Sequence, residues 1–203
     1  MTIEIDHIVF DIGRVLIHYD PELAYLDLLP DTEERRWFLE NVCTAQWNIE
    51  QDRGRDWADA EALLIERFPD HEMLIRAFRK NWQDMVPHAY ETTVSVFEQL
   101  IASGHDVTML TNFASDTFKE AQEKFPFLKA SRGVSVSGEL KLIKPDPKIY
   151  DHHNRTFALD RTKTLFIDDS DANVAAARDY GWHTIHLTKP DDLPELLSNF
   201  SLK

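Results

Sequence analysis

The sequence predicts an α/β fold, in which a doubly wound, Rossmann-like parallel sheet forms the core and a small helical cap is inserted into it. Short apolar runs of strand length recur along the chain, and helical patterns separate the later runs, which is the alternation typical of parallel sheets. Between roughly residues 21 and 87, by contrast, the pattern is helical without a strand signal. We therefore expect residues 1–18 and 88–203 to form the core and residues 19–87 to form the cap.

The predicted strands are continuous apolar runs, as expected for strands buried on both faces of a parallel sheet. They cover residues 3–12, 106–110, 164–167 and 183–187. Three predicted helices have recognisable ends. Residues 91–103 end at Gly104, residues 147–159 begin with a proline, and residues 171–180 end at Gly181. An apolar run follows each helix, in agreement with the predicted alternation.

The predicted cap consists of helical segments and carries most of the tryptophans. The helical patterns cover residues 21–29, 32–42, 56–68 and 71–85. Four of the five tryptophans lie here, namely Trp37, Trp47, Trp57 and Trp82. Because aromatic side chains bury large apolar areas, we expect them to fill a small core inside the cap.

The charge and cysteine content of the 203-residue chain disfavour several classes of protein. Thirty-six acidic residues against 22 Lys plus Arg give a formal net charge of −14, which disfavours binding to nucleic acid or to anionic membranes. Cys43 is the single cysteine, so a disulfide framework or a multi-cysteine zinc site is excluded. Neither a signal peptide nor an apolar run of membrane-spanning length is visible. We expect a cytoplasmic monomer or homodimer that binds a small molecule.

Polar residues follow three of the predicted strands at their carboxyl ends. They are Asp11 with Gly13, Thr111 with Asn112, and Asp168 with Asp169 and Ser170. In an open parallel sheet these ends meet at the ligand-binding crevice. Lys144 stands in a loop before Pro145, which keeps the preceding residue out of the helical region. A nucleophile, a hydroxyl, a cation and paired acids are thus available for one crevice.

With these residues in this order, the sequence resembles the haloacid dehalogenase-like (HAD) superfamily of hydrolases over essentially its whole length. The resemblance rests on four motifs in the family's order. They are Asp11-Ile12-Gly13-Arg14-Val15, Leu110-Thr111-Asn112, Lys144-Pro145 and Asp168-Asp169-Ser170-Asp171-Ala172-Asn173. The distance between the first two motifs leaves room for the family's helical, C1-type cap.

The resemblance implies a catalytic role for three of the motif residues. Asp11 would be the nucleophile and would form an aspartyl intermediate. Thr111 would bind an oxygen of the transferred group, helped by the backbone near Asn112. Lys144 would neutralise both Asp11 and the substrate anion.

The same resemblance implies a Mg²⁺ site. Asp11, the Gly13 carbonyl and Asp169 would bind the ion, and Asp168 and Asn173 would support the metal shell. A hard cation of this kind takes oxygen ligands from one or two carboxylates and keeps several waters, which suits this set of residues.

Gly13 departs from the commonest phosphatase pattern of the family, in which a second aspartate at this position protonates the leaving oxygen. A replacement proton donor could be water, the substrate or a cap residue such as His18, Glu50 or Arg53. The departure affects the expected substrate and rate more than the reaction class.

Residues 47–54 resemble the loop by which the caps of this family reach over the active site. Trp47 and Arg53 are candidate substrate contacts there, and Gly54 is a candidate hinge; a solvated turn between helices is the alternative. In the core, Arg14 and Asn112 are further candidate substrate contacts.

Three functions remain open. A Mg²⁺-dependent phosphatase of a small phosphorylated metabolite is favoured by the Asp168-Asp169 pair, which suits a metal. A metal-independent 2-haloacid dehalogenase is compatible with Gly13, although such enzymes typically carry small polar residues in place of those two acids. A non-catalytic binding protein is the third alternative, and the retention of all four motifs argues against it.

Overall fold

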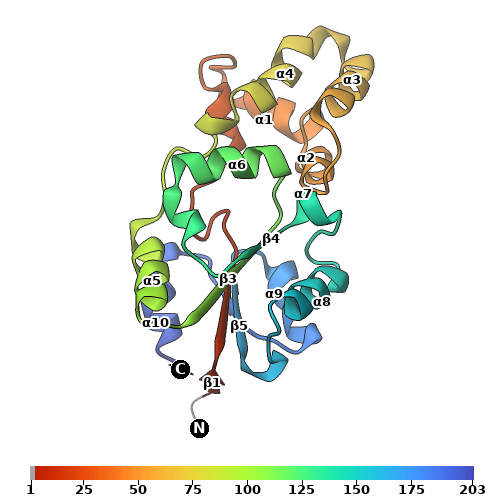
Figure 1. Ribbon diagram of the computed structural model, residues 1–203. Coiled ribbons are helices and arrows are strands. Elements are labelled where there is room, and N and C mark those ends of the chain that lie inside the picture. The colour runs from red at the N-terminus through yellow and green to blue at the C-terminus, as the bar shows by residue number, and fades with distance from the viewer. Residues whose placement is uncertain (1–2) are drawn as a thin grey trace.

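The computed structural model describes residues 3–203, and its core is a five-stranded sheet in which all neighbouring strands are parallel. The strand order is β4-β3-β2-β5-β6 (Figure 1). The strands are β2 (His7–Phe10), β3 (Asp106–Thr111), β4 (Val134–Val136), β5 (Thr164–Asp168) and β6 (His183–His186). The chain starts in the middle of the sheet and winds outward on both sides, which confirms the doubly wound, Rossmann-like fold.

Helices cover both faces of this sheet (Figure 1). They are α5 (Glu91–Ala102) and α10 (Leu193–Leu197) on one face, and α8 (Pro147–Thr156) and α9 (Asp171–Tyr180) on the other. Successive side chains of β2 enter different core clusters because side chains alternate along a strand. Phe10 packs in one cluster with Phe97 of α5, whereas Val9 packs in the other with Tyr150 of α8.

The predicted strand over residues 3–12 is divided into two strands in different sheets. β1 (Ile3–Ile5) pairs with β7 (Phe200–Leu202) in a separate parallel sheet. The division falls at Asp6, whose backbone N–H donates to the Lys163 carbonyl at 2.9 Å and whose carboxylate accepts from the Lys163 ammonium at 3.0 Å. Neither β4 nor β7 was expected, because each has only three residues, which are too few to show the alternation of apolar and polar residues that identifies a strand.

Between β2 and β3 the chain forms a group of helices above the carboxyl ends of the strands (Figure 1). They are η1 (Pro21–Tyr25), α1 (Thr32–Asn41), α2 (Ala45–Asp52), α3 (Trp57–Arg67), η2 (Pro69–His71), α4 (Glu72–Lys80) and η3 (Trp82–Asp84). The first three α-helices each begin at a capping side chain, namely Asp31, Thr44 and Asp56. These side chains accept hydrogen bonds from backbone N–H groups of the first turn, which have no partner within the helix. The helices lie where a cap was expected, and its boundaries stay a prediction.

Two predictions for the cap, one of a helix and one of a loop, are corrected. Residues 71–85 do not form one helix: α4 ends at Lys80, and the Asn81 side chain donates to the Ala24 carbonyl at 3.1 Å, so the chain turns into η3. Residues 47–54 are not mainly a loop, because α2 covers most of them. Thr44 Oγ1 accepts the Trp47 N–H at 3.0 Å and so begins that helix.

The tryptophans differ in their burial. Trp82 is buried, while Trp47 and Trp57 are partly buried and pack against Phe78. Trp37 is 48% exposed, so the expectation that it fills the cap's core was wrong. Its neighbours on α1 supply the buried face of that helix instead, chiefly Phe38.

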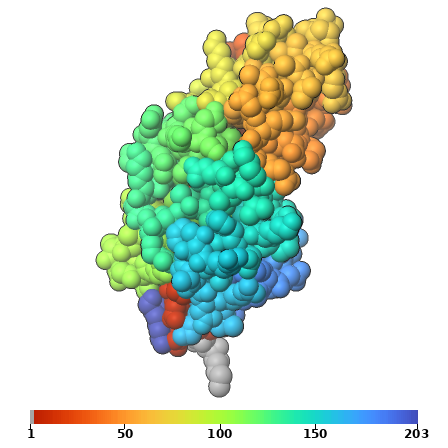
Figure 2. All heavy atoms as spheres, turned by 45° about the vertical axis from the view of Figure 1, so that its right-hand side comes forward, coloured from red at the N-terminus to blue at the C-terminus, as the bar shows by residue number. Residues whose placement is uncertain are grey.

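The end of α2 rests on the core segment that follows β4, where the orange and teal regions meet in Figure 2. Ser137 Oγ donates to the Asp52 carbonyl at 2.5 Å, and Lys141 Nζ donates to the Gly54 carbonyl at 2.7 Å. Ser137 begins the short helix α7 (Ser137–Leu140). The cap therefore contacts the core directly beside the crevice.

The remaining elements complete the core. They are α6 (Ser115–Lys124), η4 (Pro126–Lys129), η5 (Arg161–Lys163) and η6 (Pro190–Asp192). Arg79 of α4 pairs with Asp116 and Glu120 of α6 at 2.8 and 2.5 Å, which makes a second contact between cap and core. None of the helices in residues 3–203 combines the length and the apolar character that a membrane crossing needs.

Candidate active site

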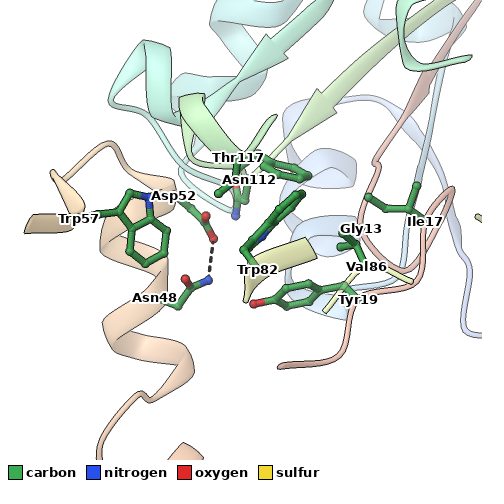
Figure 3. Close-up of a pocket in the computed structure, with 11 residues that line it drawn as sticks. Gly13, Ile17, Tyr19, Asn48, Asp52, Trp57, Trp82, Val86, Asn112 and Thr117 are labelled. Atoms are coloured by element: carbon green, nitrogen blue, oxygen red, sulfur yellow. Dashed lines mark hydrogen bonds between the residues drawn. The ribbon is translucent and has the colours of Figure 1, made fainter. Parts of the chain in front are cut away.

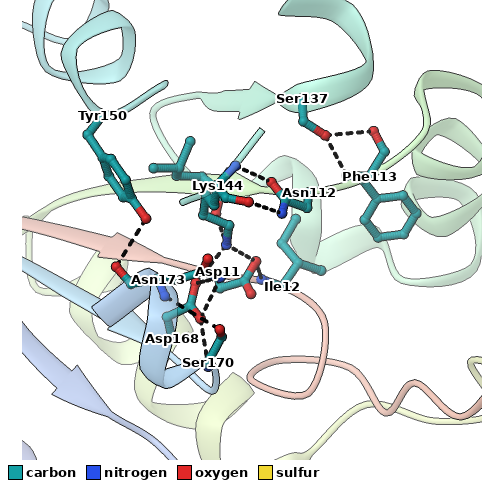
Figure 4. Close-up of polar contacts among 11 residues, drawn as sticks. Asp11, Ile12, Asn112, Phe113, Ser137, Lys144, Tyr150, Asp168, Ser170 and Asn173 are labelled. Carbon is teal, nitrogen blue, oxygen red and sulfur yellow. Dashed lines mark hydrogen bonds and ion pairs between the residues drawn. The ribbon is translucent and has the colours of Figure 1, made fainter. Parts of the chain in front are cut away.

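Asp11 and Asp168 lie side by side because β2 and β5 end together. Phe10 is in register with Ile167, and the Asp11 N–H donates to the Ile167 carbonyl at 2.9 Å, which extends the ladder by one residue. The next residue of each strand therefore presents its carboxylate at the same edge. Lys144 Nζ lies between them, 2.9 Å from Asp11 Oδ1 and 2.7 Å from Asp168 Oδ2 (Figure 4).

Lys144 is buried, with 1% of its surface exposed, and its ammonium has three acceptors. Besides the two carboxylates it donates to the Leu110 carbonyl at 3.0 Å. Burial opposes the charge of this side chain, but Asp11 and Asp168 outweigh burial and raise its pKa. A buried cation is tolerated where it is paired and fully hydrogen-bonded, so Lys144 is a fixed positive charge in this site.

Asn112 holds the loop that carries Lys144. Its side-chain amide donates to the Lys144 carbonyl at 3.0 Å and accepts the Lys144 backbone N–H at 2.8 Å. The two bonds hold the peptide groups on both sides of the Lys144 Cα and so orient this residue. The Asn112 side chain therefore positions Lys144. Asn112 also lines the pocket described below.

Asp168 is fully buried, and both of its oxygens are occupied. Oδ1 accepts the Ser170 N–H at 2.8 Å, and the Asn173 amide lies 3.0 and 3.2 Å from the two oxygens. With Lys144 on Oδ2, this carboxylate has little capacity left for another ligand. Asp168 and Asn173 therefore form a support for the lysine.

Asp11, Asp168 and Asp169 can each place one oxygen within 4.8 Å of the others. When all three carboxyl groups are ionised, they and the Lys144 ammonium have a net charge of −2 (−3 + 1). Because Asp168 is saturated, Asp11 and Asp169 are the carboxylates available to a cation. Two carboxylates with room for waters are a donor set that suits a hard divalent ion such as Mg²⁺, so the residues present fit the expected metal.

Burial raises the pKa of Asp11 to about 7, with Asp168 and Asp169 acting in the same direction and Lys144 in the opposite one. Burial and the neighbouring Asp168 also raise the pKa of Asp169. A bound cation favours the ionised form of a carboxyl group. The site therefore gains charge balance when it holds a cation.

Two other motif residues, Thr111 and Arg14, lie at the same edge of the sheet. Thr111 is the buried last residue of β3, beside Asn112. Arg14 follows Gly13 with a φ of 58°. Its guanidinium donates to the Tyr19 carbonyl at 3.3 Å and lies 5.7 Å from the centre of the Tyr19 ring. Arg14 thus lies beside the crevice, next to a residue that lines the pocket.

A pocket extends from this edge of the sheet to the underside of the cap (Figure 3). Core and cap both contribute to its lining. The lining residues are Gly13, Ile17, Tyr19, Asn48, Asp52, Trp57, Trp82, Val86, Asn112, Phe113 and Thr117. Among these described residues the apolar and aromatic side chains dominate, and Asp52 is the one carboxylic acid. The pocket can therefore surround the organic part of a substrate whose reacting group lies near Asp11.

Asp52 lies on the last turn of α2 and faces the pocket from the cap side (Figure 3). Its Oδ2 accepts from the Asn48 amide at 3.3 Å, one helical turn earlier. Burial raises the pKa of Asp52 to about 7, although a hydrogen bond with the Ala114 backbone opposes the shift. The sequence reasoning missed this residue, although it lies inside the 47–54 segment.

Several residues singled out from the sequence as substrate contacts or proton donors lie outside the pocket lining in the described structure. Trp47 Nε1 donates to the Ala60 carbonyl at 3.4 Å, so its ring packs within the cap. Arg53 pairs with Glu50 at 3.6 Å, and both side chains are about 40% exposed (43% and 39%). His18 Nδ1 lies 3.0 Å from the Tyr90 hydroxyl, in a hollow on the Asp169 side.

The family model described as haloacid dehalogenase-like hydrolase matches residues 44–187. The sesquiterpene phosphatase astK of Aspergillus oryzae is 26% identical over 183 residues, which cover 89% of this chain and 88% of that protein. The (S)-2-haloacid dehalogenase 4A of Burkholderia cepacia is 22% identical over 107 residues, which cover 53% of this chain and 46% of that protein.

A solved structure of a HAD family enzyme from Bacteroides thetaiotaomicron superposes with a TM-score of 0.76 at 20% identity and covers 96% of this chain and 98% of that chain. A complex of the same enzyme with magnesium and inorganic phosphate has a TM-score of 0.69 at 20% identity, with coverages of 89% and 93%. These likenesses show the fold. Since the family model spans most of the chain and the motif residues meet at one sheet edge, the chain belongs to the haloacid dehalogenase-like hydrolases.

Proposed function

We propose that this hydrolase is a Mg²⁺-dependent phosphatase that cleaves a small phosphate monoester through an aspartyl phosphate on Asp11. The observation that carries the proposal is the charge arrangement at the sheet edge, where three carboxylates lie within 4.8 Å and one buried lysine balances only part of their charge. An anionic phosphate would be repelled by this surplus unless a cation were bound. A metal-dependent reaction therefore suits the site better than a metal-free one.

In the proposed reaction Asp11 attacks phosphorus in line with the leaving oxygen. Lys144 and the Ile12 N–H, 2.9 and 2.7 Å from Asp11 Oδ1, hold the carboxylate in one orientation. Such positioning contributes much of the rate in phosphoryl transfer, because little covalent chemistry falls to the protein. The Thr111 hydroxyl binds a phosphoryl oxygen from the neighbouring strand end.

Asp11, Asp169 and the Gly13 carbonyl would hold the Mg²⁺ ion. When bound, Mg²⁺ supplies positive charge to the phosphoryl oxygens. Asp168 and Asn173 act indirectly in this proposal, since they hold Lys144 and keep the strand end rigid. The prediction that they support the metal shell thus becomes a proposal that they support the lysine.

The organic part of the substrate is proposed to be apolar. Its binding region is formed by aromatic and aliphatic side chains, among them Trp57, Trp82, Val86 and Phe113. Burial of apolar surface favours such a group by about 25 cal/mol per Å². The printed activity of the Aspergillus relative, a sesquiterpene phosphatase, is in line with an apolar alcohol as the leaving group.

A screen of phosphate monoesters, with and without Mg²⁺, tests the proposal. We expect hydrolysis with Mg²⁺ and its loss with a chelator, and a higher kcat/KM for apolar aliphatic phosphates than for sugar phosphates. Asp169→Ala should weaken the apparent Mg²⁺ affinity, and excess Mg²⁺ should restore only part of the rate. Activity that is unchanged by chelation would contradict the proposed metal dependence.

The alternative function is that of a 2-haloacid dehalogenase, in which Asp11 displaces halide from carbon. The Burkholderia relative and the apolar lining next to Gly13 favour it. A panel of 2-haloacids assayed without metal separates the two functions. Halide release in that panel, with no phosphate release from any ester, would replace the phosphatase proposal.

A further inference from the structure

Gly13 stands at the position where the commonest phosphatase pattern of the family carries its proton-donating aspartate. A Cβ at this position would have no heavy atom within 4 Å, and the φ of Gly13 lies outside the left-handed region. Neither crowding nor backbone conformation therefore requires a glycine here. The space that an acid would occupy is open, and a phosphate ester with a poor leaving group needs its proton from elsewhere.

The pocket lining offers two ionisable side chains, Asp52 and Tyr19, among the described residues. Burial and the nearby Asp52 raise the pKa of the Tyr19 phenol, which makes Tyr19 a poorer proton donor near neutral pH. Asp52 faces the pocket from the cap, with Gly13 on the core side (Figure 3). In an in-line displacement the leaving oxygen lies opposite to Asp11 at phosphorus, so its proton donor has to lie on the side away from Asp11, and the cap covers the crevice there.

We propose that Asp52 is the general acid of this enzyme and that it protonates the leaving oxygen from the cap side. The inference rests on the proposed phosphatase function and adds to it the residue that replaces the acid missing at Gly13. The catalytic machinery is then divided: the nucleophile comes from the core and the proton comes from the inserted cap.

The contacts of α2 hold Asp52 in place for this role. The Asn48 amide binds its carboxylate at 3.3 Å, and Ser137 Oγ binds its backbone carbonyl at 2.5 Å. The carbonyl of Gly54, two residues after Asp52, accepts a hydrogen bond from Lys141 Nζ at 2.7 Å. The end of the helix is thus tied to the core segment after β4, and a fixed donor is more effective than a mobile one.

The surroundings of Asp52 also favour its protonated form. Burial is the main cause of its raised pKa, about 7. The charged and titratable residues that line the adjoining hollow with it are Arg14, Tyr19, Asp20, Glu22 and Cys43, and the segment packed against the end of α2 adds Glu139 and Lys141. In the described structure none of them forms an ion pair with Asp52. A carboxyl group without a cationic partner keeps its proton to a higher pH.

The proposed step balances as follows. Asp11 forms a bond to phosphorus, the bond from phosphorus to the ester oxygen breaks, and that oxygen keeps the electron pair and takes the proton of Asp52. Water then attacks phosphorus, Asp52 takes a proton from this water, and the bond between Asp11 and phosphorus breaks. Alcohol and phosphate leave, and both carboxyl groups return to their starting states.

Asp52→Asn tests the inference with two esters and Mg²⁺ present. An alkyl phosphate needs protonation of its leaving oxygen, whereas p-nitrophenyl phosphate releases a stable anion. We expect kcat/KM to fall by about 10²-fold or more for the alkyl ester, in the range that general acids contribute, and to change little for the nitrophenyl ester. The wild-type rate for the alkyl ester should also decrease as the pH rises above about 7, and this decrease should be absent in the variant.

Two further variants sharpen the test. Asp59→Asn makes the same chemical change at an exposed position of α3 outside the pocket lining, and both esters should be hydrolysed at wild-type rates. Gly13→Asp in the Asp52→Asn protein places an acid in the open space at position 13, and we expect it to recover alkyl hydrolysis by about tenfold or more. Asp52→Ala, checked for folding by circular dichroism, must show the same preference for the nitrophenyl ester.

An equal loss for both esters in a folded Asp52 variant would assign the residue to structure and overturn the inference. Unchanged alkyl hydrolysis in that variant would overturn it as well. Both results differ from a failure of the proposed function, in which the wild-type protein with Mg²⁺ would hydrolyse neither ester.

Discussion

At the carboxyl ends of β2 and β5 each central charged group is held by several partners, whereas the pocket below the cap is lined mainly by apolar and aromatic side chains. Asp168 accepts bonds from three residues, and Lys144 donates to three acceptors. In the pocket, Asp52 keeps a contact from the Asn48 side chain but has no cation as a partner in the described structure. The first region is electrostatically preorganised, and the second is a hydrophobic enclosure with one acid.

This difference separates two tasks. A rigid network of paired charges suits the stabilisation of a phosphoryl group, whose charge is the same in every substrate. An apolar enclosure on an inserted element suits the recognition of the part that differs between substrates. Changes in the core should therefore affect all substrates, and changes in the cap should affect some substrates more than others.

Asp11→Asn should cause the largest loss and the same loss for every ester. The amide keeps the shape of the side chain but is a poor nucleophile, so kcat should decrease by about 10⁴-fold or more. Steady-state kinetics with circular dichroism as the folding control measure this. Near wild-type turnover by a folded variant would remove Asp11 from the nucleophile role.

Lys144→Met should abolish activity and also destabilise the fold. It leaves Asp11 and Asp168 buried without their cation, and breaking a buried pair in this way costs about 3–5 kcal/mol. Urea denaturation measures the free energy of unfolding. Lys148→Met, at an exposed position of α8, is the matched control and should stay within about 0.5 kcal/mol of wild type. Equal free energies of unfolding for the two variants would contradict the expected cost of removing Lys144 from its ion pairs with Asp11 and Asp168.

Asp52→Asn should stabilise the protein at pH 8 while it harms catalysis. The pKa of Asp52 is about 7 in the folded protein against 3.8 as its ordinary value, so the folded state holds a proton that the unfolded state releases. The stability linked to this proton is fully present below pH 3.8, decreases as the pH rises, and is lost once the pH has passed about 7.

Because asparagine has no such proton, the difference in unfolding free energy between Asp52→Asn and wild type should increase from pH 4.5 to pH 8, by about 3 kcal/mol. Denaturation curves at both pH values measure it, and Asp59→Asn should show no comparable increase. A difference that is constant with pH would contradict the raised pKa of Asp52.

Gly54→Ala should have the smallest effect and should act through the contact between cap and core. Gly54 has a φ of +94°, and an added Cβ would meet the Lys141 side chain and lie 2.6 Å from the Gly138 carbonyl. Gly104 has a similar φ of +85° but no atom within 4 Å of such a Cβ. Backbone strain should cost each alanine variant about 1–2 kcal/mol of stability, and the close contact with the Gly138 carbonyl should make Gly54→Ala the less stable of the two.

The two glycine variants should differ in kinetics. Gly54→Ala should displace the end of α2 and lower kcat/KM for alkyl esters by about tenfold, while Gly104→Ala should leave the kinetics unchanged. Stopped assays with the two phosphate esters provide the measurement. Equal kinetics of both variants would show that the proton donor does not depend on this contact.

Most of the fold and the core half of the site follow from local sequence signals. Apolar runs identified four of the five strands of the main sheet, and Gly104, Pro147 and Gly181 marked helix ends close to those observed. The two strands of the small sheet and β4 have three residues each. Such short segments form because neighbouring strands offer them partners, and local periodicity does not record those partners.

The cap half of the site could be predicted only in part. Residues 47–54 drew attention as a segment near the crevice, but Trp47 and Arg53 were selected in place of Asn48 and Asp52. Asn48 and Asp52 are four positions apart on α2, so they lie on the same face of the helix. This face lines the pocket. A segment interpreted as a loop has no such face, so its inward residues could not be chosen from the sequence.

Most of the main sheet, the order of the motifs and the convergence of Asp11 with Asp168 follow from the sequence alone, whereas the position of Lys144 beside them was implied by the family resemblance. The physical reason is that side chains directly after parallel strands converge once the strands are recognised. Only the folded structure shows which cap residues line the pocket, that Asp168 is hydrogen-bonded to Lys144, and that Trp37 is exposed while Trp82 is buried. These outcomes depend on how α2, α3 and η3 pack over the crevice. Close packing between elements that are distant in sequence depends on the shapes of both contacting surfaces, and local sequence patterns do not contain that information.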